Sequence, residues 1–311
     1  MSRPKILRAK RLTSLPWLVH GFSTRVGGFS RAYGKGDLNL GFTKEDSRAA
    51  VERNRGAFLR AIGACGDSRP RLSGRAKLDG GPTSGRAKLD GTGNLLWPLI
   101  TLRQIHSDII LCVKSVPDAP LVGDGLITAT PGLLLTVQTA DCFPVILVDT
   151  KRHAVGMFHA GWRGTVKRIV EKGVGEMFRC FGSRPHDLKA AIGPGIQSCC
   201  YEVGEEVRAK FESQFACAAS LFREVKHSDP VREKYPLLFL NARAPGHGEL
   251  PNKRFLDLVE ANRQQLLATG VPAKNIETSA LCTNCRPDLL FSHRAEKGKT
   301  GRMMGVVGVR N

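Results

Sequence analysis

Two histidines and one cysteine in the middle of the chain have the types and spacing of a metal site. Cys142 and His159 stand at the ends of two apolar runs, 143–148 and 154–158. We expect these runs to form buried strands joined by the polar turn 149–153, with a further strand at 133–138 leading to Cys142. His106, in the segment RQIHS, is the candidate third ligand. A thiolate and imidazoles at strand ends suit a metal ion such as zinc.

The ligand count indicates which chemistry such a site would support. Two imidazoles and one thiolate leave the fourth tetrahedral position for water, as in catalytic rather than structural zinc sites. A single thiolate leaves the centre formally at +1, which is enough to acidify bound water. From these residues alone a second interpretation stays open, in which Cys142 is a buried thiol and the histidines are merely hydrogen-bonded.

Asp141 and Arg163 flank this candidate site in the sequence. Asp141 would orient a ligand or act as a general base, provided that the strand ends there, as Pro144 suggests. Arg163 lies in the turn 159–164 that opens a helix, so its guanidinium and the helix amides could hold an anion. A simple strand-to-helix connection explains the same turn equally well.

Two pairs of cysteines elsewhere in the chain are weaker candidates for metal binding or redox chemistry. Cys282 and Cys285, in CTNC, have the spacing of a redox or metal pair, but no second such pair completes a four-cysteine site. We therefore expect structural thiols there. Cys199 and Cys200 are adjacent, cannot easily share a disulfide, and are expected to serve packing.

Periodicity predicts the elements that must position these residues. Apolar residues at helical spacing predict helices over 47–62, ending at Gly63, over 165–181, over 205–215 and over 255–268. Strands are expected at 188–192, 276–281 and 303–309, and the charged segment 223–236 is expected to be a loop. Because strands outnumber helices and often follow one another directly, we predict an α+β fold of layered sheets rather than a doubly wound parallel sheet.

Composition narrows the class of protein. The chain has 311 residues, of which 41% are hydrophobic and 24% charged, typical of a globular protein. No apolar run approaches the roughly 20 residues needed to span a bilayer, and the basic N-terminal segment lacks the apolar core of a signal peptide, so we expect a cytoplasmic protein that does not bind membranes. Nine cysteines, an odd number at irregular spacing, do not indicate a disulfide framework.

The net charge of +19 raises the possibility that the protein binds nucleic acid. Its lysines and arginines are scattered along the chain without a nucleic-acid motif or an aromatic stacking array, which favours a general basic background. A basic nucleic-acid-binding module with a structural zinc stays open as an alternative.

Residues 66–94 contain the repeat SGRAKLDG twice, at 73–80 and 84–91. Two copies cannot build a solenoid, so we expect a loosely ordered insertion in a single domain spanning 1–311.

Several motifs together give the chain a specific resemblance. In order, they read HGFSTRVGG, LNLG, RQIHS, TADCFPV, HAGWRG, IGPGIQSCCYEVG and CTNCRPDLLFSHR. The chain resembles, from Leu18 to Val309, the YfiH-like family of purine nucleoside phosphorylases, also described as multicopper polyphenol oxidases with a laccase domain. The resemblance implies a single domain of packed mixed sheets flanked by helices. It also implies zinc held by His106, Cys142 and His159.

The same resemblance implies an activity. Members of the family phosphorolyse adenosine, inosine and methylthioadenosine, and deaminate adenosine. Candidate residues for holding substrate or phosphate are then Arg25, Asn39, Arg163, Arg294 and Arg302, with Asp141 as possible base. Zinc is preferred to copper because a laccase needs many histidines, and only two of the eight stand in ligand-like motifs. The alternative within enzymes is an amidohydrolase that edits a peptidoglycan precursor. The sequence indicates no oligomeric state.

Overall fold

Two mixed β-sheets pack face to face at the centre of the molecule. The computed structural model describes residues 3–66, 95–225 and 252–310. Of the predicted insertion 66–94, only Gly66 falls within the described residues. None of the helices in these ranges has the length and apolar character needed to cross a bilayer.

A six-stranded sheet carries the central hairpin of the chain. Its strands, in spatial order, are β18 (Ile276–Thr278), β14 (Leu188–Ile192), β12 (Phe143–Asp149), β13 (Ala154–Ala160), β10 (Gly125–Thr128) and β8 (Ile110–Cys112). The hairpin partners β12 and β13 are antiparallel, with Phe143 opposite Ala160 and Asp149 opposite Ala154. Every residue of both strands is buried, because the sheet is covered on both faces. The predicted strands and the turn between them are confirmed.

A five-stranded sheet lies against the first one. Its order is β1 (Ile6–Leu7), β2 (Leu18–Ser23), β19 (Met303–Val309), β11 (Leu134–Thr139) and β6 (Leu99–Ile100). Leu135 and Val307 from this sheet belong to the same buried cluster as Ile146 and Met157 from the other sheet. Alternate side chains of the two sheets thus share one core, as the period of two along a strand requires. The C-terminal strand predicted at 303–309 lies at the middle of this sheet.

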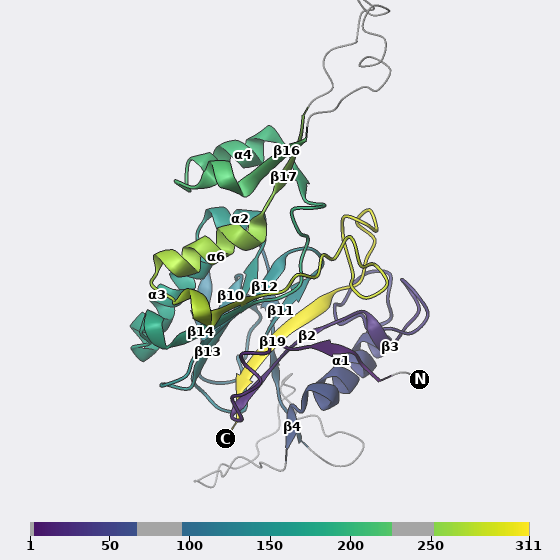
Figure 1. Cartoon of the computed structure of the whole chain (residues 1–311). Helices are drawn as coiled ribbons and strands as arrows, with labels where there is room; N and C mark the ends of the chain where they lie inside the picture. The colour runs from purple at the N-terminus through teal and green to yellow at the C-terminus, as the bar shows by residue number, and fades with distance from the viewer. Residues whose placement is uncertain (1–2, 67–94, 226–251, 311) are drawn as a thin grey trace, which may run out of the picture.

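Helices cover the two outer faces. Helix α1 (Arg48–Ile62) packs on the five-stranded sheet, whereas α3 (Ile169–Phe181) and α6 (Leu258–Ala268) pack on the six-stranded sheet, on the opposite side of the molecule (Figure 1). The Ser47 hydroxyl caps α1 by accepting from the Ala50 amide at 3.2 Å, and Gly63 ends it with φ of 75°. The result is the predicted α+β architecture, with four layers.

The remaining elements lie at the edges of these layers. A three-stranded sheet of order β15 (Glu202–Val203), β17 (Lys253–Leu256) and β16 (Phe222–Val225) projects with α4 (Glu205–Glu212) on the side of α3 and α6 (Figure 1). The bounds of the remaining elements are β3 (Val26–Ser30), β4 (Cys65–Gly66), β5 (Leu95–Leu96), β7 (Leu102–Arg103), β9 (Leu121–Val122) and α2 (Trp162–Val166).

The helix predicted over 165–181 is interrupted. Helix α2 ends at Val166, Arg168 has a φ of 64°, and α3 begins at Ile169. The Thr165 carbonyl accepts from the Arg168 amide, only three residues on, and from Gln265 Nε2 of α6 at 2.8 Å. A tertiary contact therefore breaks a continuous apolar periodicity, because the buried Thr165 is bonded to α6.

Other boundaries also differ from the prediction. Residues 223–225 belong to β16 rather than to a loop, and 226–236 lie outside the described residues. The start of the predicted helix 255–268 is taken by β17, which pairs with β15 and β16, so α6 begins at Leu258. Helix α4 ends at Glu212, and β18 ends at Thr278. At 223–225 and at the start of the predicted helix 255–268, strand pairing overrides the local pattern.

Candidate metal centre

The structure brings together the three predicted ligands. One ligand atom each from His106, Cys142 and His159 lies within 4.8 Å of the others. The rings of the two histidines meet edge to face, with centroids 4.9 Å apart. His159 is buried, Cys142 is half-buried and His106 is exposed, so the group is rooted in the core and opens to solvent on one side. That arrangement suits a reacting centre that a small molecule must reach.

The central hairpin fixes two of the ligands. Cys142 directly precedes β12, and His159 is the penultimate residue of the antiparallel partner β13. Gly161 follows β13 and begins α2. A Cβ atom at Gly161 would lie 2.8 Å from Cys142 Sγ and 3.3 Å from His106 Cδ2. The glycine therefore leaves the space that the ligand side chains occupy.

Asp124 holds both histidines of the group, His106 and His159, in place. Its carboxylate accepts from the backbone amides of Ile105, His106 and Ser107 at 3.2, 3.1 and 2.6 Å. These bonds hold His106 in the left-handed region, at a φ of 56°. Asp124 Oδ1 also lies 2.8 Å from Nδ1 of His159, which leaves the Nε2 atom of that ring for a metal ion. A carboxylate behind a ligating histidine fixes its tautomer and orientation.

The charges in this group are mutually dependent. Burial opposes ionisation of Cys142, but the positive charge of His159 and hydrogen bonds from both histidines lower the pKa of its thiol to about 6. Burial likewise opposes protonation of His159, but Cys142 and Asp124 raise its pKa to about 9. Burial also acts against ionised Asp124, yet the His159 ring and Ser107 hold the pKa of its carboxyl below the usual range. A thiolate is therefore available at neutral pH, as metal binding requires.

This donor set fits zinc. Two imidazole nitrogens and one thiolate are ligands that zinc prefers, and a set of three protein ligands leaves a position open for water. The backing of His159 by the wholly buried Asp124 matches the arrangement around metal-ligating histidines. The residues can thus hold the ion that the motifs imply.

Asp141 lies beside Cys142 in a loop, as the prediction required. Strand β11 ends at Thr139, and Asp141 has a φ of 91°. Its Oδ1 accepts from the hydroxyls of Thr283 and Ser292 at 2.6 and 2.7 Å, and its Oδ2 accepts from the Arg294 amide at 2.7 Å. The carboxylate therefore joins the Cys142 loop to the C-terminal segment. Its role as a base stays a prediction.

Two of the predicted anion-binding arginines share the surroundings of Cys142. Burial and next the charge of Cys142 raise the pKa of Tyr201, while Arg294 and Arg163 act in the opposite direction. These residues are thus within electrostatic reach of one another. Arg163 is exposed, stacks on Trp162 at 4.4 Å, and makes no ion pair with any described residue. Arg294 donates to the Glu202 carbonyl at 3.0 Å.

The other three predicted binding residues, Arg25, Asn39 and Arg302, take part in hydrogen bonds between the N-terminal loops and the C-terminal segment. Arg25 is paired with Asp37 at 2.7 Å and with Glu296 at 3.2 Å. Asn39 is buried, and its Oδ1 accepts from the Arg302 amide at 2.9 Å. The Arg302 guanidinium donates to two carbonyls of its own segment. These groups are occupied in joining the N-terminal loops to the C-terminal segment, and their role in binding substrate stays a prediction.

Sequence reasoning missed Asp124 and Tyr201. Asp124 lies in the turn GDG between β9 and β10, where an aspartate is commonplace. Its place in the sequence could have identified it, because Asp124 directly precedes β10, which pairs with β13, the strand that carries His159. Tyr201 follows the adjacent cysteines in a motif that was noted only for its resemblance.

The cysteine pairs also differ from the expectation. Cys199, Cys200, Cys282 and Cys285 place their sulfur atoms within 4.8 Å of one another. The second pair that CTNC lacked in the sequence is the adjacent pair, which the fold brings alongside it. The premise that no second pair could complete a four-cysteine group was wrong, because spacing along the chain does not reveal contacts between loops more than 80 residues apart. A structural or packing role for these cysteines stays a prediction.

Comparison with known proteins agrees with these observations. The family model of the multi-copper polyphenol oxidoreductase laccase matches residues 19–69 and 86–310. A purine nucleoside phosphorylase of Deinococcus radiodurans is 33% identical over 308 residues, covering 98% of this chain and 92% of that protein. The adenosine deaminase RL5, from an unknown prokaryotic organism, is 38% identical over 66% of this chain and 70% of its own.

A solved structure shows the same fold. The crystal structure of a hypothetical YfiH protein of Bacillus licheniformis superposes with a TM-score of 0.74 at 30% identity, covering 99% of this chain and 97% of that one. From the family match along nearly the whole chain, and from a relative one third identical over almost its full length, this protein belongs to the multi-copper polyphenol oxidoreductase laccase family, the YfiH-like proteins.

Proposed function

We propose that this protein is a zinc-dependent purine nucleoside phosphorylase that also deaminates adenosine. The observation that carries the proposal is the convergence of His106, Cys142 and His159 on one point, with Asp124 behind His159. Relatives named purine nucleoside phosphorylase and adenosine deaminase support the choice of reaction. Adenosine, inosine and methylthioadenosine, with phosphate, are the substrates proposed.

The three ligand side chains would hold zinc, and the ion would supply Lewis-acid activation of water or of a substrate oxygen. Cys142 would contribute the negative charge, and both histidines would bind as neutral imidazoles, with His159 giving up one ring proton when the ion binds. Asp124 keeps the Nδ1 proton on His159, so that Nε2 presents its lone pair to the centre. The exposed His106 side leaves an approach for the nucleoside.

Arg163 and Arg294 are the proposed anion holders. Phosphorolysis needs a fixed phosphate and stabilisation of positive charge that develops on the ribose. Arg163 is suited to phosphate because its guanidinium is exposed and makes no ion pair with a described carboxylate. Arg294 is placed through its backbone, since its amide donates to Asp141. Asp141 would act as base only on release of one of its donors.

The donor groups give no support to an oxidase with several copper centres. Within the described residues, the groups able to hold a metal are the triad of His106, Cys142 and His159 and the four cysteines. Neither group contains more than two histidines, whereas multicopper oxidation requires several histidine-rich centres. The family name therefore does not decide the reaction.

The decisive experiment is one incubation of purified, metal-analysed protein with adenosine, with and without phosphate. Adenine formed only with phosphate would establish phosphorolysis, and inosine formed without phosphate would establish deamination. We expect both products, separated by chromatography. Zinc-loaded protein that forms neither would refute the nucleoside function, and a muramyl peptide would then be the substrate to try.

Cys142→Ala is the matching variant. We expect loss of both activities and of one metal equivalent, because the variant lacks the only anionic ligand of the triad. Cys180→Ala is the control, since Cys180 is a half-buried thiol on α3 outside both candidate metal groups. An active Cys142→Ala protein would contradict the proposed centre.

The two classes of arginine give different expected results. Arg163→Gln should raise the KM for phosphate at least tenfold while leaving the free energy of unfolding unchanged, because its guanidinium is exposed. Arg25→Gln should lower stability, because it leaves the buried Asp37 and the half-buried Glu296 without this ion-pair partner. Steady-state kinetics and urea unfolding of both variants measure the contrast. The assignment of Arg163 fails if the KM for phosphate does not change.

A further inference from the structure

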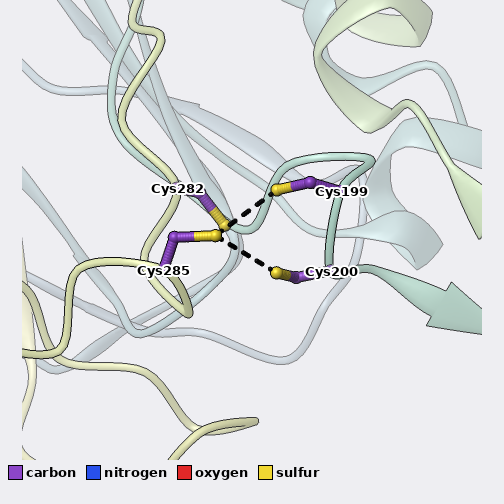
Figure 2. A group of neighbouring side chains, drawn as sticks. All are labelled: Cys199, Cys200, Cys282 and Cys285. Carbon is purple, nitrogen blue, oxygen red and sulfur yellow. Dashed lines mark hydrogen bonds between the residues drawn. The ribbon is translucent and has the colours of Figure 1, made fainter.

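Four cysteines from two loops converge outside the centre formed by His106, Cys142 and His159. Cys199 and Cys200 lie in the turn before β15, and Cys282 and Cys285 lie in the loop after β18 (Figure 2). We propose that these four thiolates bind one zinc ion in a closed, structural site, here called the four-cysteine site. This inference is independent of the proposed function, because it concerns a second ion that need not touch substrate.

The distances fit a single ion. Cys285 Sγ lies 3.3 Å from Cys200 Sγ and 3.6 Å from Cys199 Sγ, and all four sulfur atoms lie within 4.8 Å of one another. In a tetrahedral site with zinc–sulfur bonds of about 2.3 Å, neighbouring sulfurs are about 3.8 Å apart. Four thiolates around one point select zinc or a single iron, and zinc needs no redox partner.

Backbone amides point at the most buried sulfur. The Gln197 amide donates to Cys282 Sγ at 3.4 Å, and the Cys285 amide donates to the same sulfur. Cys282 is buried, with an exposed fraction of 5%. Hydrogen bonds from amides to ligating thiolates orient them and offset their charge. Such amide donors would stabilise a neutral thiol only slightly, because its sulfur is a weak hydrogen-bond acceptor.

The backbone holds the two loops in register. Gly195 forms a parallel bridge with Cys282, and the Thr283 amide donates to the Gly195 carbonyl at 3.1 Å. The Gln197 side chain donates to the Ser279 carbonyl at 3.2 Å. Hydrogen bonds that do not involve sulfur thus hold the two loops together, so the loops that carry the four cysteines are already adjacent before an ion binds.

A disulfide explains the group less well. A disulfide joins two sulfurs at about 2.05 Å, and adjacent cysteines such as Cys199 and Cys200 rarely pair with each other. A bond from either one to Cys285 would leave two thiols beside it without a role. A metal ion uses all four side chains at once.

The site would have a structural effect on the first centre. Tyr201 directly follows Cys200 and lies within electrostatic reach of Cys142. Thr283 lies between the cysteines of CTNC and donates its hydroxyl to Asp141 at 2.6 Å. An ion holding both loops would therefore fix the residues on one side of the first centre.

Metal content tests the proposal. The purified full-length protein should contain two equivalents of zinc per chain, and Cys285→Ser should contain one. Cys285 is chosen because it is exposed and its substitution disturbs no packing. Cys180→Ser, outside both groups, should retain two. Equal zinc contents in the wild-type and Cys285→Ser proteins would overturn the four-cysteine site.

Two measurements on the wild-type chain do not depend on the folding of a variant. Cobalt substituted for zinc should show the intense sulfur-to-cobalt absorption of a four-thiolate site in addition to that of the first centre. Denatured without reductant, the protein should titrate nine thiols, the full number of its cysteines. A cobalt spectrum with the absorption of only one thiolate ligand would refute the four-cysteine site. A titration of seven thiols rather than nine would also refute it, and would identify a disulfide instead.

Discussion

At the scale of single residues, the geometry of the proposed metal centre depends on groups that would not touch the ion. Asp124 is wholly buried and links both histidine ligands, accepting from the His106 amide and facing Nδ1 of His159. Gly161 contributes only the absence of a side chain. Both residues are therefore more informative targets than the ligands themselves, because their substitution changes geometry rather than ligand count.

Asp124→Asn should weaken zinc binding by about 10–100-fold, the usual effect of losing a carboxylate behind a ligating histidine. An amide offers one acceptor oxygen where the carboxylate serves three amides, the Ser107 hydroxyl and His159. Competition with a chromophoric chelator measures the affinity. Asp149→Asn is the control, since Asp149 is equally buried but lies at the other end of β12. Equal affinities in the two variants would contradict the role of Asp124.

Gly161→Ala should displace Cys142 or His106 and reduce both zinc affinity and activity at least tenfold, because its Cβ would lie 2.8 Å from the Cys142 sulfur. The matched control is Gly204→Ala. Gly204 begins α4 with φ and ψ of −81° and 171°, against −79° and 170° at Gly161, and its nearest contact would be at 3.9 Å. Zinc titration of the two variants separates crowding from any effect on helix initiation.

At the scale of elements, α3 shows how close packing against the sheet limits which residue types a helix position can hold. Gly173 faces Phe158 of β13, and a Cβ there would lie 2.6 Å from the ring. Gly175, on the same helix, has no atom within 4 Å of such a Cβ. The periodicity that predicts the helix does not distinguish these two glycines, because only one of them touches the sheet.

The same substitution should therefore act in opposite directions at these positions. Gly173→Ala should lower the free energy of unfolding by about 1–3 kcal/mol through overpacking against Phe158, which is fully buried. Gly175→Ala should raise it by up to about 1 kcal/mol, since alanine has the higher helix propensity. Urea unfolding of both proteins measures the difference. Stabilisation of both would show that α3 moves away from the sheet at little cost.

At the scale of the whole molecule, stability should depend on pH through one histidine remote from the metal ligands. His20 lies in β2 at 1% exposure, with Nε2 3.3 Å from the Ala9 carbonyl and Nδ1 without a partner among the described residues. Burial, helped by Arg8, lowers its pKa to about 4. The folded protein thus disfavours the charged ring.

The sign follows from proton linkage. In the unfolded chain His20 has the ordinary pKa of about 6.5 and becomes protonated below that pH. In the folded chain the ring stays neutral until the pH falls to about 4. Stability is therefore fully present above pH 6.5 and should fall by about 3 kcal/mol on acidification to pH 4. His20→Gln should lose this part of the pH dependence. Urea unfolding at several pH values, compared between the two proteins, tests it, and parallel curves would exclude His20 as the cause.

The amino-acid sequence alone determined the elements whose apolar pattern agrees with their surroundings. Strands β12, β13 and β19 are apolar on both faces because they are covered on both faces, and α1 carries its own cap residues at Ser47 and Gly63. The grouping of His106, Cys142 and His159 was predictable because zinc accepts few residue types and because family motifs surround these residues.

Only the tertiary structure decided which distant residues meet. The break between α2 and α3, the carboxylate of Asp124 behind His159, and the occupation of Arg25 by Asp37 and Glu296 all depend on contacts between separate elements. The joining of CTNC to Cys199 and Cys200 has the same origin, since those loops are brought together by β14 and β18 pairing in one sheet. Local patterns report the periodicity of one element, whereas a site is formed by the packing of several.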